Sequence, residues 1–180
     1  MPTNIEIKAR VRDAALLRKR AEGLSDTPGE LLIQEDTFFA VPVGRLKLRR
    51  LAPSRGELIY YEREDLSGPK SSHYSVCRTS DPEGLHAVIA SFLAVRGVVR
   101  KQRWLFKTGN TRIHVDEVEG LGAFMELEVV LKPGQSAEDG KAVAEDLMRK
   151  LSIHNADLVE GAYVDLLGKP ESTPRDGSTQ

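Results

Sequence analysis

Hydrophobic and polar residues alternate in eight segments of the chain. Alternation is typical of strands, because successive side chains point to opposite faces of a sheet. The pattern predicts strands at about residues 3–11, 35–41, 44–51, 56–64, 71–79, 98–107, 110–118 and 123–131. Segments such as Thr108-Gly109-Asn110 separate neighbouring strands, which is turn chemistry between antiparallel partners.

Helical spacing of apolar residues marks four further segments. They are residues 13–24, 80–97, 136–151 and about 157–167. Asp13 and Ser136 fit the N-cap positions of the first and third segments, and Pro82 fits the first turn of the second. Gly161 weakens the helical signal of the short fourth segment.

The order of these elements predicts the fold class. Most strands follow one another without a helix between them, which does not fit a parallel βαβ sheet. Eight strands with few helices favour an α+β protein: an eight-stranded antiparallel closed β-barrel flanked by helices. We expect this domain to span residues 1–168. Residues 169–180 hold no apolar anchor, which predicts a disordered C-terminal tail.

The polar faces of these strands carry an unusual concentration of charge. In the first strand Asn4, Glu6 and Lys8 share one face and the residues between them are apolar. The segment Arg45-Leu46-Lys47-Leu48-Arg49 places three cations on one face. Like charges side by side repel each other unless an anion lies between them.

Three later strands also carry charged or polar residues on one face only. The sets are Lys101 with Arg103, Arg112 with His114 and Asp116, and Glu126 with Glu128. For one strand taken alone, the simplest interpretation is a polar face that meets water. The opposite faces are strongly apolar, however, and the predicted helices are available to cover them. A barrel would then turn all the charged faces into one lumen.

A lumen with cations and carboxylates suggests a ligand that needs both. Magnesium prefers oxygen ligands and is commonly held by a few carboxylates together with substrate phosphates. Lysine and arginine side chains would bind the remaining phosphate oxygens. Because many charges converge, a triphosphate fits better than a monophosphate.

Composition narrows the choice of partners. The 26 basic and 27 acidic residues nearly cancel, which argues against a general nucleic-acid binder. The single cysteine, Cys77, excludes an intrachain disulfide and a zinc site built on several thiolates. No apolar run approaches the ~20 residues that span a bilayer, and the start of the chain leads directly into a strand. We expect a cytoplasmic protein without a membrane partner; a homodimer remains open.

The charged segments, in this order, resemble the CYTH, or triphosphate tunnel, family. Asn4-Ile5-Glu6-Ile7-Lys8 is similar to the family's ExExK signature, and the resemblance extends over about residues 4–167. The family includes class IV adenylate cyclases, thiamine triphosphatases and inorganic tripolyphosphatases. The segments that continue the resemblance are residues 45–49, 60–63, 100–103, 112–116, 118–122 and 126–128. The glycine-flanked segment before Glu126 looks closest to the cyclase branch.

The resemblance implies roles for individual residues. Those implied as magnesium ligands, with manganese as the alternative ion, are Glu6, Glu126, Glu128 and Asp116. Those implied as the triphosphate clamp are Lys8, Lys47, Arg49, Arg63, Lys101, Arg103 and Arg112, of which Lys8, Lys47 and Arg49 would also act in catalysis. Arg10, Arg45 and Arg78 fit either the clamp or a solvated surface. Tyr60 and Tyr61 fit packing positions, and His114 fits a hydrogen-bonding neighbour of Asp116.

One departure from the motif bears on activity. Asn4 replaces the first glutamate of ExExK, which keeps an oxygen ligand and removes its charge. A second metal would then be held more weakly, and hydrolysis that depends on two metals would suffer. Three functions stay open: a triphosphate hydrolase, an adenylate cyclase whose nucleophile is the substrate's own 3′-hydroxyl, and a catalytically weak polyphosphate or nucleotide binder.

Overall fold

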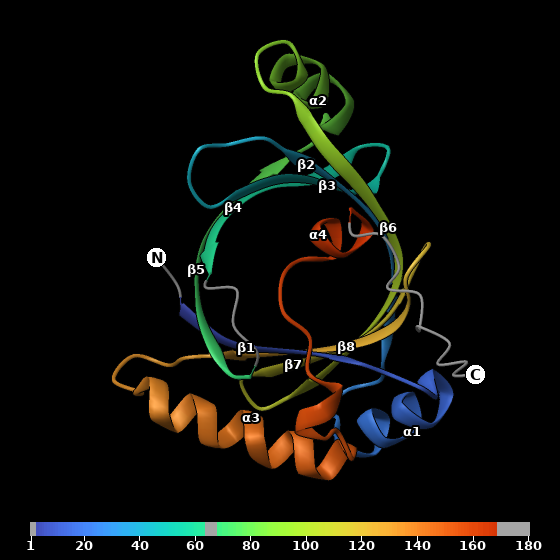
Figure 1. The fold of residues 1–180 in the computed structure, drawn as a ribbon, viewed down its shortest axis with the longest axis vertical. Helices are drawn as coiled ribbons and strands as arrows, with labels where there is room; N and C mark the ends of the chain where they lie inside the picture. The colour runs from blue at the N-terminus through green and yellow to red at the C-terminus, as the bar shows by residue number, and fades with distance from the viewer. Residues whose placement is uncertain (1–2, 64–67, 169–180) are drawn as a thin grey trace, which may run out of the picture.

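The computed structural model describes residues 3–63 and 68–168, whose strands form a closed antiparallel β-barrel (Figure 1). The order of strands around the barrel is β1-β5-β4-β3-β2-β6-β7-β8. The predicted α+β class and the closed eight-stranded barrel are therefore confirmed. The predicted tail, residues 169–180, lies outside the described residues. None of the helices in the described ranges is long and apolar enough to cross a membrane.

All eight predicted strands are present. They are β1 (Thr3–Arg10), β2 (Glu30–Phe39), β3 (Arg45–Ala52), β4 (Arg55–Arg63), β5 (Lys70–Thr79), β6 (Val95–Thr108), β7 (Thr111–Val118) and β8 (Gly122–Val130). β2 begins five residues before its predicted start. Its first residues pair with β6 from Glu30↔Leu105 onward, although three consecutive apolar residues there hide the alternation.

Three of the predicted helices are confirmed, with one change of length. They are α1 (Ala14–Leu24), α2 (Pro82–Ala90) and α3 (Ala137–Leu151). Asp13 caps α1 by accepting a hydrogen bond from the Leu16 amide, and Ser136 forms a capping box with Asp139. α2 ends at Ala90 instead of continuing to residue 97, because the chain from Val95 onward joins β6.

The fourth predicted helix is wrong over most of its length. The chain forms a short 3-10 helix, η1 (Asn155–Asp157), and then a separate five-residue helix, α4 (Tyr163–Leu167). Between them Gly161 adopts φ +80°, a left-handed conformation that interrupts a helix.

The main apolar core lies outside the barrel wall. α1 and α3 cover the outer face of the sheet formed by β1, β7 and β8 (Figure 1). Ile5, Ile7 and Leu127 point outward from the strands and pack with α3 residues Leu147 and Leu151, all almost fully buried. Because apolar burial outside the wall stabilises the fold, the lumen face is free to carry charge.

The chain re-enters the barrel after α3. Leu158 forms a bridge with Ala9, and the amide of Val159 donates to the carbonyl of Lys8 at 2.9 Å. α4 then lies inside the ring of strands next to β6 (Figure 1). Its Asp165 accepts hydrogen bonds from Arg45 on β3 and Arg96 on β6. α4 thereby closes the lumen at the end where β3 and β6 begin.

Candidate active site

The lumen contains a cavity of about 850 Å³ whose lining is rich in charge. The predicted site residues that line it are Glu6, Lys8, Lys47, Arg49, Arg63, Lys101, Arg103, Arg112, Glu126 and Glu128. Asp116 is fully buried and is bonded to two lining residues, Arg103 and Tyr163. Residues from strands at both ends of the sequence thus meet in one chamber, because the barrel closes by pairing β1 with β8.

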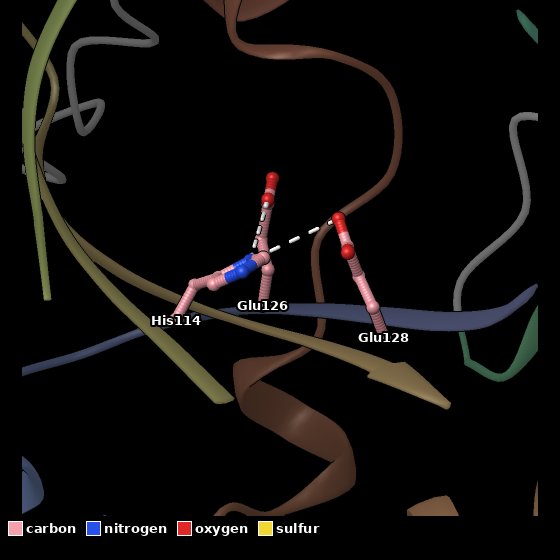
Figure 2. A group of neighbouring side chains, drawn as sticks. All are labelled: His114, Glu126 and Glu128. Atoms are coloured by element: carbon pink, nitrogen blue, oxygen red, sulfur yellow. Dashed lines mark ion pairs between the residues drawn. The ribbon is translucent and has the colours of Figure 1, made fainter. Parts of the chain in front are cut away.

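One side of the chamber, the acidic wall, consists of Glu6, His114, Glu126 and Glu128. Strand register brings these side chains together: Glu6 lies opposite Glu128 across β1 and β8, and His114 lies opposite Glu126 across β7 and β8. The ligand atoms of His114, Glu126 and Glu128 lie within 4.8 Å of one another (Figure 2).

The acidic wall fits a divalent metal ion. His114 Nδ1 is buried and lies 3.9 Å from a Glu126 oxygen and 3.8 Å from a Glu128 oxygen. Within the described part of the chain this nitrogen has no hydrogen-bond partner. Buried polar atoms are rarely left without a partner, so this nitrogen is available to coordinate a metal ion. The two carboxylates suit hard ions such as magnesium and manganese, whereas an imidazole nitrogen suits softer ions such as zinc, iron and nickel.

Nearby cations keep these carboxylates ionised. Burial by itself would raise the pKa of Glu126, but Arg103 and Lys8 outweigh burial and hold the pKa well below its usual range. Burial is likewise offset at Glu128, where His114 and Arg103 lower the pKa. Only ionised carboxylates bind metal ions strongly.

The other two predicted metal ligands already have close cationic partners. Glu6 accepts a hydrogen bond from Arg63 at 2.7 Å. Asp116 accepts two hydrogen bonds from Arg103, at 2.7 and 2.5 Å, and one from the Tyr163 hydroxyl at 2.9 Å. Arg103 also reaches Glu126 at 2.6 Å. Asp116 therefore orients Arg103 toward the acidic wall.

Asn4 extends the acidic wall along β1. Its side chain is 3% exposed and lines the cavity two residues before Glu6. Its Oδ1 atom has no hydrogen-bond partner among residues 3–63 and 68–168. The residue that departs from the ExExK pattern thus retains an unpaired oxygen in the chamber.

The opposite side, the cationic wall, consists of Lys47, Arg49 and Lys101 gathered around Asp36. Lys47 Nζ and Lys101 Nζ each lie 3.0 Å from Asp36 Oδ2, and Arg49 Nε lies 2.8 Å from Oδ1. Asp36 was missed by sequence reasoning because the run around it does not alternate. Its role follows from strand pairing, which sets it opposite Arg49.

Burial shapes the titration of the cationic wall. Burial would raise the pKa of Asp36, but Arg49, Lys101 and Lys47 outweigh it and hold the pKa well below its usual range. Burial lowers the pKa of Lys47 to about 7, with Arg49 adding to the effect and Asp36 opposing it. Lys101 also has a lowered pKa, first because it is buried. One carboxylate cannot neutralise three cations, so the wall carries a positive excess below about pH 7, where Lys47 is protonated.

Lys8 and Arg63 lie between the acidic wall and the re-entering chain. Lys8 Nζ donates to the carbonyl of Gly161 at 2.9 Å and lies 3.4 Å from Glu126. It also lies 3.9 Å from the centre of the Tyr163 ring. Burial lowers the pKa of Lys8 to about 8, although Glu126 opposes the shift. Arg63 donates to the same Gly161 carbonyl at 3.1 Å.

The remaining candidate residues differ in how far they are buried and in what they contact. Arg112 is half exposed and contacts Glu128 at 3.3 Å. Arg45 holds α4, while Arg78 is highly exposed at the cavity mouth. Tyr61 packs in a buried cluster, as its predicted packing role requires. Sequence reasoning missed Tyr163, because the return of α4 into the lumen has no local signal.

Comparison with known proteins identifies the family and the fold. A model described as the CYTH domain matches residues 2–163. The structure resembles the PH1012 protein of Pyrococcus horikoshii OT3, with 27% identity, a TM-score of 0.81, and coverage of 91% of this chain and 99% of that one. It also resembles HpAC1 from Hippeastrum, described as having a dominant triphosphatase activity, with 15% identity, a TM-score of 0.64, and coverage of 93% and 95%. A sequence search of curated proteins gives no match.

A conserved hypothetical protein of Pyrococcus furiosus shares the fold at 21% identity and a TM-score of 0.80, with coverage of 91% of this chain and 99% of that one. The family match covers all eight strands of the barrel and α3, so it includes both walls of the lumen. The chain belongs to the CYTH domain family.

Proposed function

We propose that this protein is a metal-dependent phosphoryl-transfer enzyme that acts on a triphosphate bound in the lumen. A single observation carries the proposal: the cationic wall keeps excess positive charge, and the acidic wall of the same chamber keeps an unused nitrogen beside two ionised carboxylates. A triphosphate with a divalent ion complements both features at once.

The acidic wall would hold the metal. We assign Glu126, Glu128 and His114 as ligands, and Glu6 and Asn4, which line the same cavity from β1, as further candidates to contribute oxygen atoms. A bound magnesium or manganese ion supplies charge neutralisation at phosphate oxygens. Asp116, the fourth predicted ligand, serves the site by orienting Arg103.

The cationic side would bind the phosphates. Lys47, Arg49 and Lys101 donate to the triphosphate from the positions that Asp36 already fixes. Arg103, Arg63, Lys8 and Arg112 complete the clamp toward the acidic wall. Phosphoryl transfer depends mainly on positioning and charge stabilisation. Donors fixed before the reaction stabilise the charge that develops in the transition state.

Three outcomes remain for a bound triphosphate. Attack by water on the terminal phosphorus gives hydrolysis, and the triphosphatase activity described for HpAC1 makes this outcome the first to test. Attack by a ribose 3′-hydroxyl on the α-phosphorus gives a cyclic nucleotide and pyrophosphate. Binding with weak turnover is the third outcome, because Asn4 replaces a motif glutamate.

One assay separates these outcomes. The protein is incubated with ATP, thiamine triphosphate or tripolyphosphate in magnesium or manganese, and phosphate, pyrophosphate and cyclic AMP are resolved. Calorimetry measures binding of the same compounds. We expect binding of at least one triphosphate and metal-dependent release of phosphate or pyrophosphate. If none of the three compounds binds or reacts with either ion, the proposed function is wrong.

A further inference from the structure

Exposed apolar side chains gather at one region outside the lumen. Within residues 3–63 and 68–168, nine large apolar residues are exposed, and five of them lie on or next to α2 or on the outer face of β2. These five are Leu31, Ile33, Val88, Phe92 and Val95. Contiguous exposed apolar surface typically marks a place that another molecule covers.

α2 stands out from the barrel on the side opposite α1 and α3 (Figure 1). One face of α2 packs on the sheet, where Ile89 belongs to a buried cluster. The rest of its surface exposes Val88 (60%) and, just after the helix, Phe92 (68%), which together are here called the α2 knob. Residues 84–95 contain no lysine, arginine, aspartate or glutamate. A helix that is apolar on all sides is normally buried, so the α2 knob is suited to a partner.

An outer groove of about 1200 Å³ lies beside the α2 knob. It crosses β3, β2, β6 and β7, which are neighbours in that order around the barrel. Ile33 lines the groove and is 59% exposed. Glu83, in the first turn of α2, lines it as well. The α2 knob and the outer groove therefore adjoin each other on one side of the molecule.

The lining of the outer groove holds charges of both signs that pair with each other. Arg50 donates to Glu83 at 2.5 Å, and Arg100 donates to Glu35 at 2.9 Å. All four residues line the groove. Because these charges already have partners, an uncharged occupant that covers Ile33 fits the groove without leaving a buried charge unpaired.

α2 has the length and the chemistry of such an occupant. Its nine residues form a helix about 14 Å long. Four adjacent strands span about the same distance, because neighbouring strands lie about 4.8 Å apart. An anionic membrane or a nucleic acid would instead require clustered lysines and arginines, which residues 84–95 lack.

We infer that two copies of this chain form a twofold dimer in which the α2 knob of each copy lies in the outer groove of the other. A twofold axis uses the same surface of both copies, so an adjacent knob and groove are both filled in one closed interface. Two such contacts double the area that one short helix can bury, and a standard interface buries about 800 Å² per partner. The partner would also cover the back of the cationic wall, since Glu35 and Arg100 directly precede Asp36 and Lys101.

Sedimentation velocity over a range of protein concentrations tests the dimer. We expect a monomer–dimer equilibrium in the wild type without larger species. Phe92→Asp in the α2 knob and Ile33→Asp in the outer groove should each weaken dimerisation about 30-fold or more, the usual effect of losing a central interface residue. Both positions are exposed, so circular dichroism should show that the variants remain folded.

The matched control is Leu16→Asp on α1. Leu16 is exposed, and it lies two residues from the groove residue Ala14, which places the two on nearly opposite sides of that helix. This variant introduces the same charge at an exposed apolar position outside the groove. It should dimerise as the wild type does, whereas equal weakening by all three substitutions would contradict the assigned surfaces.

Cross-linking tests how the two copies meet. In a Cys77→Ser background, a chain with Ile33→Cys is mixed with a chain with Phe92→Cys and treated with a short bismaleimide. We expect a product that joins the two different chains, and none when Leu16→Cys replaces Ile33→Cys. The inference is overturned if the wild type stays monomeric at all concentrations, if it forms open-ended assemblies, or if only chains with Phe92→Cys join each other. A monomer that floats with phosphatidylcholine vesicles would assign the α2 knob to a lipid surface and would equally overturn the dimer.

Discussion

The two walls of the lumen are both built from charged side chains, but they lack different partners. The cationic wall has too few anions, and the acidic wall has a nitrogen without a partner. In the cationic wall three cations share one carboxylate, Asp36. In the acidic wall the carboxylates of Glu126 and Glu128 flank a histidine nitrogen that has no partner in the described part of the chain. Buried charge is stable only when it is paired, so each wall is partly satisfied by protein and partly suited to a ligand.

The carboxylates of the two walls also have different roles. Asp36 is 1% exposed and holds its wall together from the centre. Glu128 keeps more exposure and faces the cavity from the edge of its wall. We therefore expect loss of Asp36 to affect folding first, and loss of Glu128 to affect ligand binding first. The following predictions run from the largest expected effect to the smallest.

Asp36→Asn should cause the largest loss of stability. The amide keeps the shape of the side chain but leaves Lys47, Arg49 and Lys101 without their shared anion. Removing one partner from a buried ion pair typically lowers stability by about 3–5 kcal/mol. Urea unfolding without added ligand measures the effect. Added tripolyphosphate should restore part of the lost stability, because anions supply the missing charge.

The matched control for Asp36→Asn is Glu35→Gln on the same strand. Glu35 is partly exposed on the outer face and pairs with Arg100 at 2.9 Å. Such surface pairs contribute about 0–1 kcal/mol, so this variant should unfold almost as the wild type does. Equal stability of the two variants would show that Asp36 does not organise the cationic wall.

Glu128→Ala should weaken metal binding while leaving the fold intact. Even changes to residues behind a metal ligand typically lower metal affinity by about 10–100-fold, so losing a ligand should cost about 100-fold or more. Calorimetric titration with manganese and turnover at limiting metal measure the loss. Glu117→Ala, which changes an exposed residue of β7 outside the lumen, is the control. Normal turnover of Glu128→Ala at limiting metal would contradict the assignment.

Lys8→Ala should reduce kcat by on the order of 100-fold, the typical effect of losing a charge-stabilising donor. Lys8→Arg should recover only part of the activity, because a planar guanidinium cannot replace a compact ammonium in a tight contact. Lys8 also touches Gly161 and Glu126, so a purely structural role is the competing explanation. Under that explanation stability and metal affinity change, and kcat at saturation does not.

The barrel and the direction of its charged faces could be predicted because face alternation is a local property. Glu6 and Lys8 share a lumen face whichever strands lie beside them. The cationic wall could not be predicted in full, because Asp36 meets Arg49 only through the register of two strands. Tyr163 and the Gly161 carbonyl could not be predicted either. They reach the site only because a segment distant in sequence, with the five-residue helix α4, returns into the lumen.

Sequence reasoning therefore identified the charges but not their partners. It assigned Lys47, Arg49 and Lys101 to phosphate, whereas the structure also pairs them with Asp36. Pairing by protein and binding to phosphate are compatible, since one anion leaves the wall with excess positive charge. Burial in this wall adds a consequence that composition alone does not contain, namely the lowered pKa of Lys47, which the pairing with Asp36 opposes.

The smallest predicted effect concerns pH and the cationic wall alone. Burial, with help from Arg49, lowers the pKa of Lys47 to about 7, so much of this lysine is neutral above that pH. A triphosphate favours the ammonium form, so binding should take up a proton. The dissociation constant for tripolyphosphate should weaken by at most about tenfold per pH unit between pH 7 and 9 from this group. Calorimetry in buffers of different ionisation enthalpy measures the uptake.

The pH dependence that Lys47 gives to folding stability is opposite in sign to the one that it gives to triphosphate binding. Measuring both therefore makes the test sharper. Between about pH 7 and the ordinary lysine pKa of 10.5, the unfolded chain binds a proton at Lys47 that the folded protein lacks. The contribution of Lys47 to folding stability therefore rises with pH in this window, while its contribution to triphosphate binding falls. Lys47→Arg stays charged and should flatten both trends. If Lys47→Arg leaves proton uptake unchanged, Lys47 is not the titrating group.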